Sequence, residues 1–214
     1  MKLWGAAILA ALLVIGTWLV VRGRPVTFRS GVVAQGSESA TAALQDFGAV
    51  PDFTLVSQTG DTVRSQDLRG PWIADFMFTT CGSICPVMSA QFEQLSTRLD
   101  ERVRLVSFSV DPERDTPERL AEYAARYGAV PARWLFLTGE KADVRRLVQD
   151  GFRLGVDDAA PEDIARGADT ILHSTRFVLV DANARIRGYY DSTEGNAMKQ
   201  LEHDVERLLA ENVP

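Results

Sequence analysis

The chain contains two cysteines, and both lie in the stretch T-T-C-G-S-I-C-P, at positions 81 and 85. Two thiols this close can form a disulfide, hold a soft metal ion or pack as inert apolar side chains. They follow the apolar run W-I-A-D-F-M-F and precede Pro86, a pattern typical of a strand that leads into a helix. Chance would seldom place both cysteines at one such junction, so we favour a chemical role.

A helix that begins at this pair would give the thiols unusual properties. The helix dipole stabilises a thiolate near its N-terminus and lowers the thiol pKa. If Cys81 and Cys85 share one helical turn, their Cα atoms lie about 6 Å apart, which a disulfide tolerates. The pair can therefore hold a metal ion when reduced and act as a redox pair that closes on itself when oxidised.

A third ligand for a metal ion would come from one of the two histidines. His203 lies opposite the apolar stripe of its predicted helix, so we expect it at the surface. His173 lies in I-L-H-S-T-R-F-V-L-V-D, before a predicted strand, in a loop that can return beside the cysteine helix. Taken alone, a loop histidine is more often simply hydrogen-bonded. Beside two cysteines without a third partner it becomes a candidate ligand. Two sulfurs and one imidazole favour copper, whereas zinc usually takes a fourth ligand.

The elements that must position these residues follow from hydrophobic periodicity. A hairpin with its turn at Q-T-G-D opens the domain. Strands are predicted at residues 72–78, 103–110, 134–137, 176–181 and 185–190. Helices are predicted at residues 86–99, about 116–127, 142–149 and 197–210. This order predicts an α/β fold with a mixed sheet between helix layers, the order of the thioredoxin-like fold.

The N-terminal segment differs from the rest of the chain. Residues 3–21 contain no charged side chain and span roughly 28 Å as a helix, about the thickness of a bilayer core. We therefore expect an uncleaved membrane anchor at 1–22, a flexible linker at 23–48 and one domain at 49–214. A buried core helix is the alternative. Three arginines follow the span and one lysine precedes it, which by itself favours a cytoplasmic domain.

The charge excludes one class of partner. The net charge is −6, and no acidic residue precedes Glu38, so the predicted domain is strongly acidic. Such a surface repels phosphate backbones, and we expect no nucleic-acid binding. Two cysteines are also too few for a disulfide scaffold.

The chain resembles the Sco/SenC family of membrane-anchored, copper-binding assembly factors for cytochrome c oxidase. The resemblance rests on F-T-T-C-G-S-I-C-P, S-V-D-P-E-R-D-T-P-E-R-L, W-L-F-L-T-G and H-S-T-R-F-V-L-V-D, which span about residues 50 to 190. It implies a thioredoxin-like fold with copper bound by Cys81, Cys85 and His173. It also implies a role in delivering copper to the CuA centre of oxidase subunit II or to another copper enzyme, or in reducing that subunit's cysteines. A copper-donor chaperone or a thiol reductant would be a further partner.

The resemblance also bears on location. Because no Arg-rich transit peptide precedes the anchor, we expect a single-pass protein of a bacterial inner membrane with its domain in the periplasm. This expectation opposes the charge count around the span. Copper transfer is more plausible outside a cytosol that buffers the metal tightly.

Some positions depart from the family pattern or carry a plainer interpretation. Gly82 stands where many relatives have proline, and Leu172 where an acidic residue is common. The acidic stretch 157–169 is expected to form a mobile loop near the site. Asp115 or Thr116 can cap the helix that follows, and Asp115 is interpreted as a residue for helix capping and loop hydrogen bonding. Asp111 is a candidate supporting residue behind the ligands or for docking.

Two other functions compete with copper delivery. A thiol–disulfide oxidoreductase could use the same cysteines without metal, although such enzymes normally have C-x-x-C and need no histidine. This leaves open whether the chain is an enzyme or mainly a metallochaperone. A peroxidase of the same fold is the weaker alternative, because T-T-C only faintly matches a peroxidatic loop.

Overall fold

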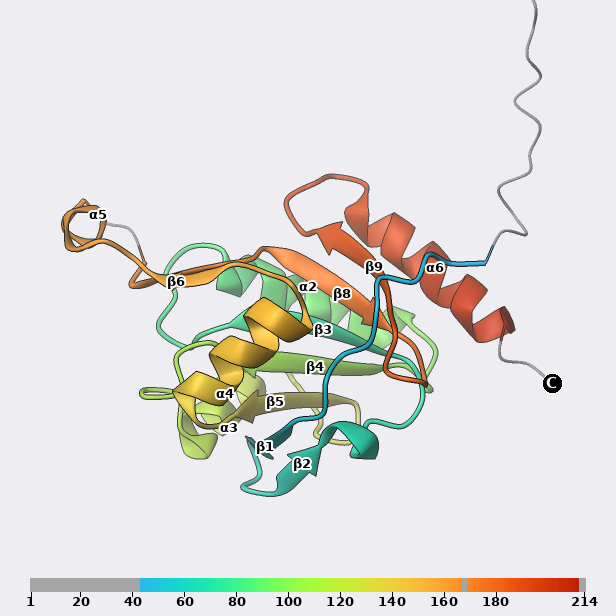
Figure 1. The fold of residues 1–214 in the computed structure, drawn as a ribbon, viewed down its shortest axis with the longest axis horizontal. Coiled ribbons are helices and arrows are strands. Elements are labelled where there is room, and N and C mark those ends of the chain that lie inside the picture. Colours follow the sequence, from blue (N-terminus) through green and yellow to red (C-terminus); the bar gives the residue numbers. More distant parts are fainter. Residues whose placement is uncertain (1–42, 167–168, 212–214) are drawn as a thin grey trace, which may run out of the picture. The chain divides into compact units, whose positions relative to one another are not determined.

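A computed structural model describes residues 43–166 and 169–211. Its core is a seven-stranded mixed sheet with the strand order β2-β1-β5-β4-β3-β8-β9 (Figure 1). The strands are β1 (Thr54–Ser57), β2 (Thr62–Arg64), β3 (Trp72–Met77), β4 (Arg104–Ser109), β5 (Trp134–Thr138), β8 (Arg176–Val180) and β9 (Ile186–Asp191). The central strands β3, β4 and β5 are parallel, whereas β1 and β8 pair antiparallel with their neighbours. The predicted mixed sheet is therefore confirmed.

Helices cover both faces of the sheet, as Figure 1 shows. They are α2 (Cys85–Arg98), α3 (Pro117–Arg126), α4 (Lys141–Arg146), α5 (Pro161–Ala165) and α6 (Ala197–Glu211), with a 3₁₀ turn, η1 (Ser65–Asp67), after β2. On the face of α2 and α3, Phe92 packs against Trp134 and Phe177. On the face of α4, Phe152 packs against Phe76 and Phe108. Because β3 is buried on both faces, its sequence is nearly all apolar.

The predicted helix at residues 142–149 is only partly confirmed. The α-helix α4 ends at Arg146 and continues as a π-helical turn, η2 (Leu147–Gly151). A Cβ at Gly151 would lie 2.7 Å from Pro51, so the glycine permits close packing there. The wider turn brings Phe152 into the core.

The prediction of a loop over residues 157–169 is wrong in part. Strand β6 (Val156–Asp158) pairs antiparallel with β7 (Ile171–His173), and α5 lies between them. Pro161 at the start of α5 supplies the backbone angle that a first helical turn requires. His173 therefore ends a short strand instead of lying in a loop.

Nothing in the structure addresses the membrane segment. Across residues 43–166 and 169–211, no helix has both the length and the apolar character to cross a membrane. The anchor expected at residues 1–22 and most of the linker lie outside the described residues.

Candidate metal centre

The cysteine turn lies at the end of β3, where the chain enters α2. Cys85 is the first residue of this helix, and the cap residue Ile84 offers no side-chain acceptor. The Sγ of Cys81 takes this role, because the backbone N–H of Cys85 donates to it over 3.3 Å. The sulfur therefore lies at the positive end of the helix dipole, where a thiolate is stabilised.

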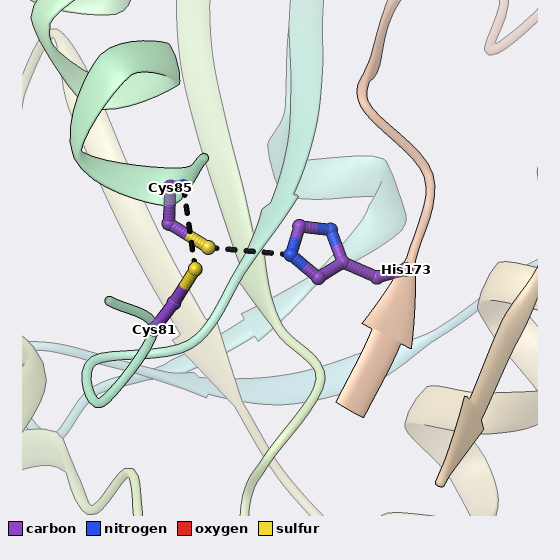
Figure 2. Close-up of side chains that lie close together, drawn as sticks. All are labelled: Cys81, Cys85 and His173. Carbon is purple, nitrogen blue, oxygen red and sulfur yellow. Dashed lines mark hydrogen bonds between the residues drawn. The ribbon is translucent and has the colours of Figure 1, made fainter. Parts of the chain in front are cut away.

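The imidazole of His173 approaches the cysteines from β7 (Figure 2). Its Nδ1–H donates to the carbonyl of Ser174 over 3.0 Å, which leaves the lone pair on Nε2. Nε2 lies 3.2 Å from the Sγ of Cys85. The ring of Phe78 packs edge-on against the imidazole, with 5.6 Å between ring centroids. The orientation of His173 is therefore fixed by a hydrogen bond and by packing.

Cys81, Cys85 and His173 each present one ligand atom to a common point. These three atoms all lie within 4.8 Å of one another. A metal ion that is about 2.0–2.3 Å from sulfur and nitrogen ligands holds those ligands at separations of nearly this size. Small side-chain movements would complete a three-coordinate site. The soft donor set of two sulfurs and one nitrogen suits copper.

The two thiols differ in acidity. The thiol of Cys85 and nearby backbone N–H groups stabilise the thiolate of Cys81, and they lower the pKa of Cys81 to about 4. The neighbouring Cys81 thiolate and burial raise the pKa of Cys85. Neither cysteine is in a disulfide in this structure. Both thiols are buried, and Cys81 is the one whose thiolate is stabilised.

We expect alkylation to distinguish the two thiols. At pH 6, iodoacetamide should modify Cys81 at least about tenfold faster than Cys85, because only a thiolate reacts and Cys85 is fully buried. Peptide mapping by mass spectrometry of the reduced, copper-free chain measures both rates, and the urea-unfolded chain is the control. Equal rates in the folded chain would contradict the asymmetry.

Asp115 supports the cysteine turn. Its interpretation as a helix cap is wrong, whereas the loop hydrogen bonds expected of it and the alternative cap, Thr116, are confirmed. The cap of α3 is Thr116, whose side chain accepts from the N–H of Arg119. Asp115 is buried and accepts from the backbone N–H and hydroxyl of Thr79 and from Ser109. It joins the loop after β4 to the residues that precede Cys81. The motif D-T-P marked this residue as important but did not indicate its partner.

Asp111 has a different partner from Asp115. It is buried and forms an ion pair with Arg114 at 3.0 Å. Arg114 also donates to the hydroxyl of Thr170 over 3.3 Å. Among the described residues, no hydrogen bond joins Asp111 to a candidate ligand. Its supporting role therefore stays a prediction, with Arg114 as the connection to the segment before His173.

Other predicted residues lie where the sequence suggested, and one important residue was missed. His203 is exposed on α6 and does not belong to the cluster of Cys81, Cys85 and His173. Leu172 is exposed beside His173.

Asp169, which the sequence placed only within an acidic stretch, accepts a hydrogen bond from the backbone N–H of Gly82 over 3.0 Å. One signal could have identified Asp169: it lies four residues before His173, in the segment that leads into the same strand.

Comparisons with known proteins agree with this geometry. The family model for SCO1/SenC matches residues 41–210. The SCO1 protein homolog of Bacillus subtilis is 35% identical over 161 residues, covering 73% of this chain and 80% of the relative. The solved structure of BsSco, described as a member of the Sco family of cytochrome c oxidase assembly proteins with a disulfide switch, has a TM-score of 0.66. It is 30% identical, and the match covers 77% of this chain and 96% of that one.

A copper-bound structure shares the fold as well. ScoI of Arabidopsis thaliana, solved with copper bound, has a TM-score of 0.64 and is 24% identical. The match covers 76% of this chain and 99% of that one. At this identity the likeness concerns the fold alone, and it is the thioredoxin-like fold that the order of elements predicted.

Proposed function

The chain belongs to the SCO1/SenC family, and from this premise we propose that it is a membrane-anchored copper chaperone. Its cargo is copper, held by Cys81, Cys85 and His173. Its recipient is the CuA centre in subunit II of cytochrome c oxidase. The observation that carries the proposal is the convergence of two sulfurs and one imidazole nitrogen within 4.8 Å.

The geometry suits a carrier better than a permanent copper site. Cys81, on the turn before α2, and Cys85 are both buried, whereas His173 is half-buried. Cys85 and His173 are held by a helix and a strand. A recipient's thiolate would approach copper from the side of His173 and replace one ligand at a time. Copper would then pass on without existing free in solution.

We place this reaction in the periplasm of a bacterium. The apolar residues 3–21 would anchor the chain in the inner membrane, and residues 23–48 would hold the domain away from it. This arrangement brings the copper site to the side of the membrane on which an exported CuA domain matures.

A thiol–disulfide oxidoreductase is the second candidate, favoured by the unequal thiols. The thiolate of Cys81 would attack a disulfide in the partner, forming a mixed disulfide and releasing one partner thiolate. Cys85, after losing its proton, would attack the Sγ of Cys81 and release the second. Two electrons pass to the partner, the pair ends as a disulfide, and a thiol reductant must regenerate it.

Transfer to an isolated recipient tests the proposal. The chain with reduced cysteines, loaded with equal amounts of Cu(I) and Cu(II), is mixed with the reduced, copper-free CuA domain of subunit II, and the absorption of the mixed-valence CuA centre is followed. We expect CuA to form faster than with an equal amount of copper bound to a small chelator. If the chain forms no CuA but reduces the disulfide of the oxidised domain, the oxidoreductase is the correct function.

A further inference from the structure

One carboxylate connects the two segments that carry the candidate ligands. Oδ1 of Asp169 accepts from the backbone N–H of Gly82 over 3.0 Å, and Oδ2 accepts from the hydroxyl of Ser83. Oδ2 also lies 3.5 Å from the Sγ of Cys81. Asp169 therefore contacts three consecutive residues of the cysteine turn.

Asp169 is well placed to relate this turn to the histidine. It precedes His173 by four residues, in the segment that leads into β7. The neighbouring Thr170 is fixed at two points, since its carbonyl accepts from Ala159 N–H and its hydroxyl from Arg114. The carboxylate thus extends from an anchored segment to the turn of Cys81.

The carboxylate is not among the converging ligand atoms. Cys81, Cys85 and His173 form a cluster within 4.8 Å, and Asp169, although described, does not belong to it. Its oxygens lie beside Cys81, where they bind the turn through an N–H and a hydroxyl. Hydrogen bonds to an ionised acceptor are short and strong, so they restrict the turn more than neutral ones would.

We propose that Asp169 is a positioning residue, which holds the turn of Cys81 close to His173 and so slows the loss of copper. The inference rests on the proposed function, because it assigns a role within the same copper site. Without Asp169, the backbone N–H of Gly82 and the hydroxyl of Ser83 would lose the carboxylate of the histidine segment to which both donate. The sulfur of Cys81 would then sample positions farther from the imidazole, and copper would dissociate sooner.

The test compares Asp169→Ala and Asp169→Asn in the full-length chain in detergent, loaded with Cu(II). Dissociation into excess EDTA is followed by the thiolate-to-copper absorption. We expect Asp169→Ala to release copper about 10–100-fold faster, the usual effect of losing a residue that orients metal ligands, and to shift the absorption band. Asp169→Asn should recover part of the loss, because its amide oxygen still accepts a hydrogen bond. Asp157→Ala, which removes an exposed acid from the same hairpin, is the matched control.

A double variant separates hydrogen bonding from charge. If Asp169 acts through the turn, Ser83→Ala alone has a smaller effect, and adding it to Asp169→Ala changes nothing more. The proposal is overturned if Asp169→Ala releases copper no faster than Asp157→Ala. It is equally overturned if Asp169→Asn matches Asp169→Ala while Ser83→Ala has no effect, since charge alone would then act.

A measurement without copper keeps this inference separate from the proposed function. In the copper-free reduced chain, Asp169→Ala should change the rate at which iodoacetamide modifies Cys81 several-fold, because the sulfur is no longer held. A parent chain that binds no copper would remove the proposed function. An unchanged alkylation rate would remove the positioning of Cys81 by Asp169.

Discussion

Replacing His173 with alanine is expected to weaken Cu(II) binding by about 100-fold or more. The imidazole is the sole nitrogen donor of the cluster, and its Nε2 lone pair already faces the sulfur of Cys85. Losing residues that merely orient ligands typically weakens metal binding 10–100-fold, so losing a ligand should exceed that range. Competition titration against a chelator measures the affinity, and the thiolate-to-copper absorption should fade with it.

The chain provides its own control for this experiment. His203 is exposed on α6, so His203→Ala removes an imidazole without touching the cluster. His203→Ala should bind copper like the parent. Exchange of the cysteine pair with a glutathione redox buffer should stay near normal in both variants, because it needs only the sulfurs. Parent-like copper binding by His173→Ala would mean that His173 is not a ligand.

Local patterns predicted the fold and the cluster for a physical reason. The buried strand β3, the proline-marked start of α2 and the strand after His173 each have a clear hydrophobic signature. Because β3 pairs antiparallel with β8, the end of β3 lies beside the start of β8. The cysteine turn after β3 and the segment before β8 therefore lie at the same end of the two strands. Convergence of His173 on the cysteines follows from this pairing.

The supporting residues could not be predicted in the same way. Asp115 reaches Thr79 across 36 positions, and Asp169 reaches Gly82 across 87. Such contacts depend on the path of loops, which no hydrophobic period encodes. A carboxylate near a helix start also favours capping by default, and this misled the interpretation of Asp115. Similarly, polar composition at residues 157–169 concealed the strand pairing of β6 with β7.

Asp75 presents a different problem, because it is an acid inside the core. Its side chain alternates with those of Ala74 and Phe76 on β3, so it faces the α2 side of the sheet. Asp75 is completely buried, and neither carboxyl oxygen has a hydrogen-bond partner among the described residues. Burial raises its pKa to about 7. Asp75 is therefore protonated in the folded chain at mildly acidic pH.

This buried acid should make stability fall as pH rises. Between pH 4 and 7, unfolded Asp75 is ionised and folded Asp75 keeps its proton, so raising the pH favours the unfolded chain. The loss should total on the order of 4 kcal/mol and level off above pH 7. Asp75→Asn removes the charge and preserves the shape. Its unpaired amide lowers stability by an amount that does not depend on pH.

We compare the free energy of unfolding of Asp75→Asn with that of the parent. From pH 5 to pH 8 the variant should gain about 3 kcal/mol relative to the parent. Urea unfolding of the reduced, copper-free chain, followed by fluorescence of the buried Trp72 and Trp134, measures it. Asp150→Asn, which removes an exposed carboxylate, is the matched control. Curves that stay parallel across this range would show that folded Asp75 ionises like an exposed acid.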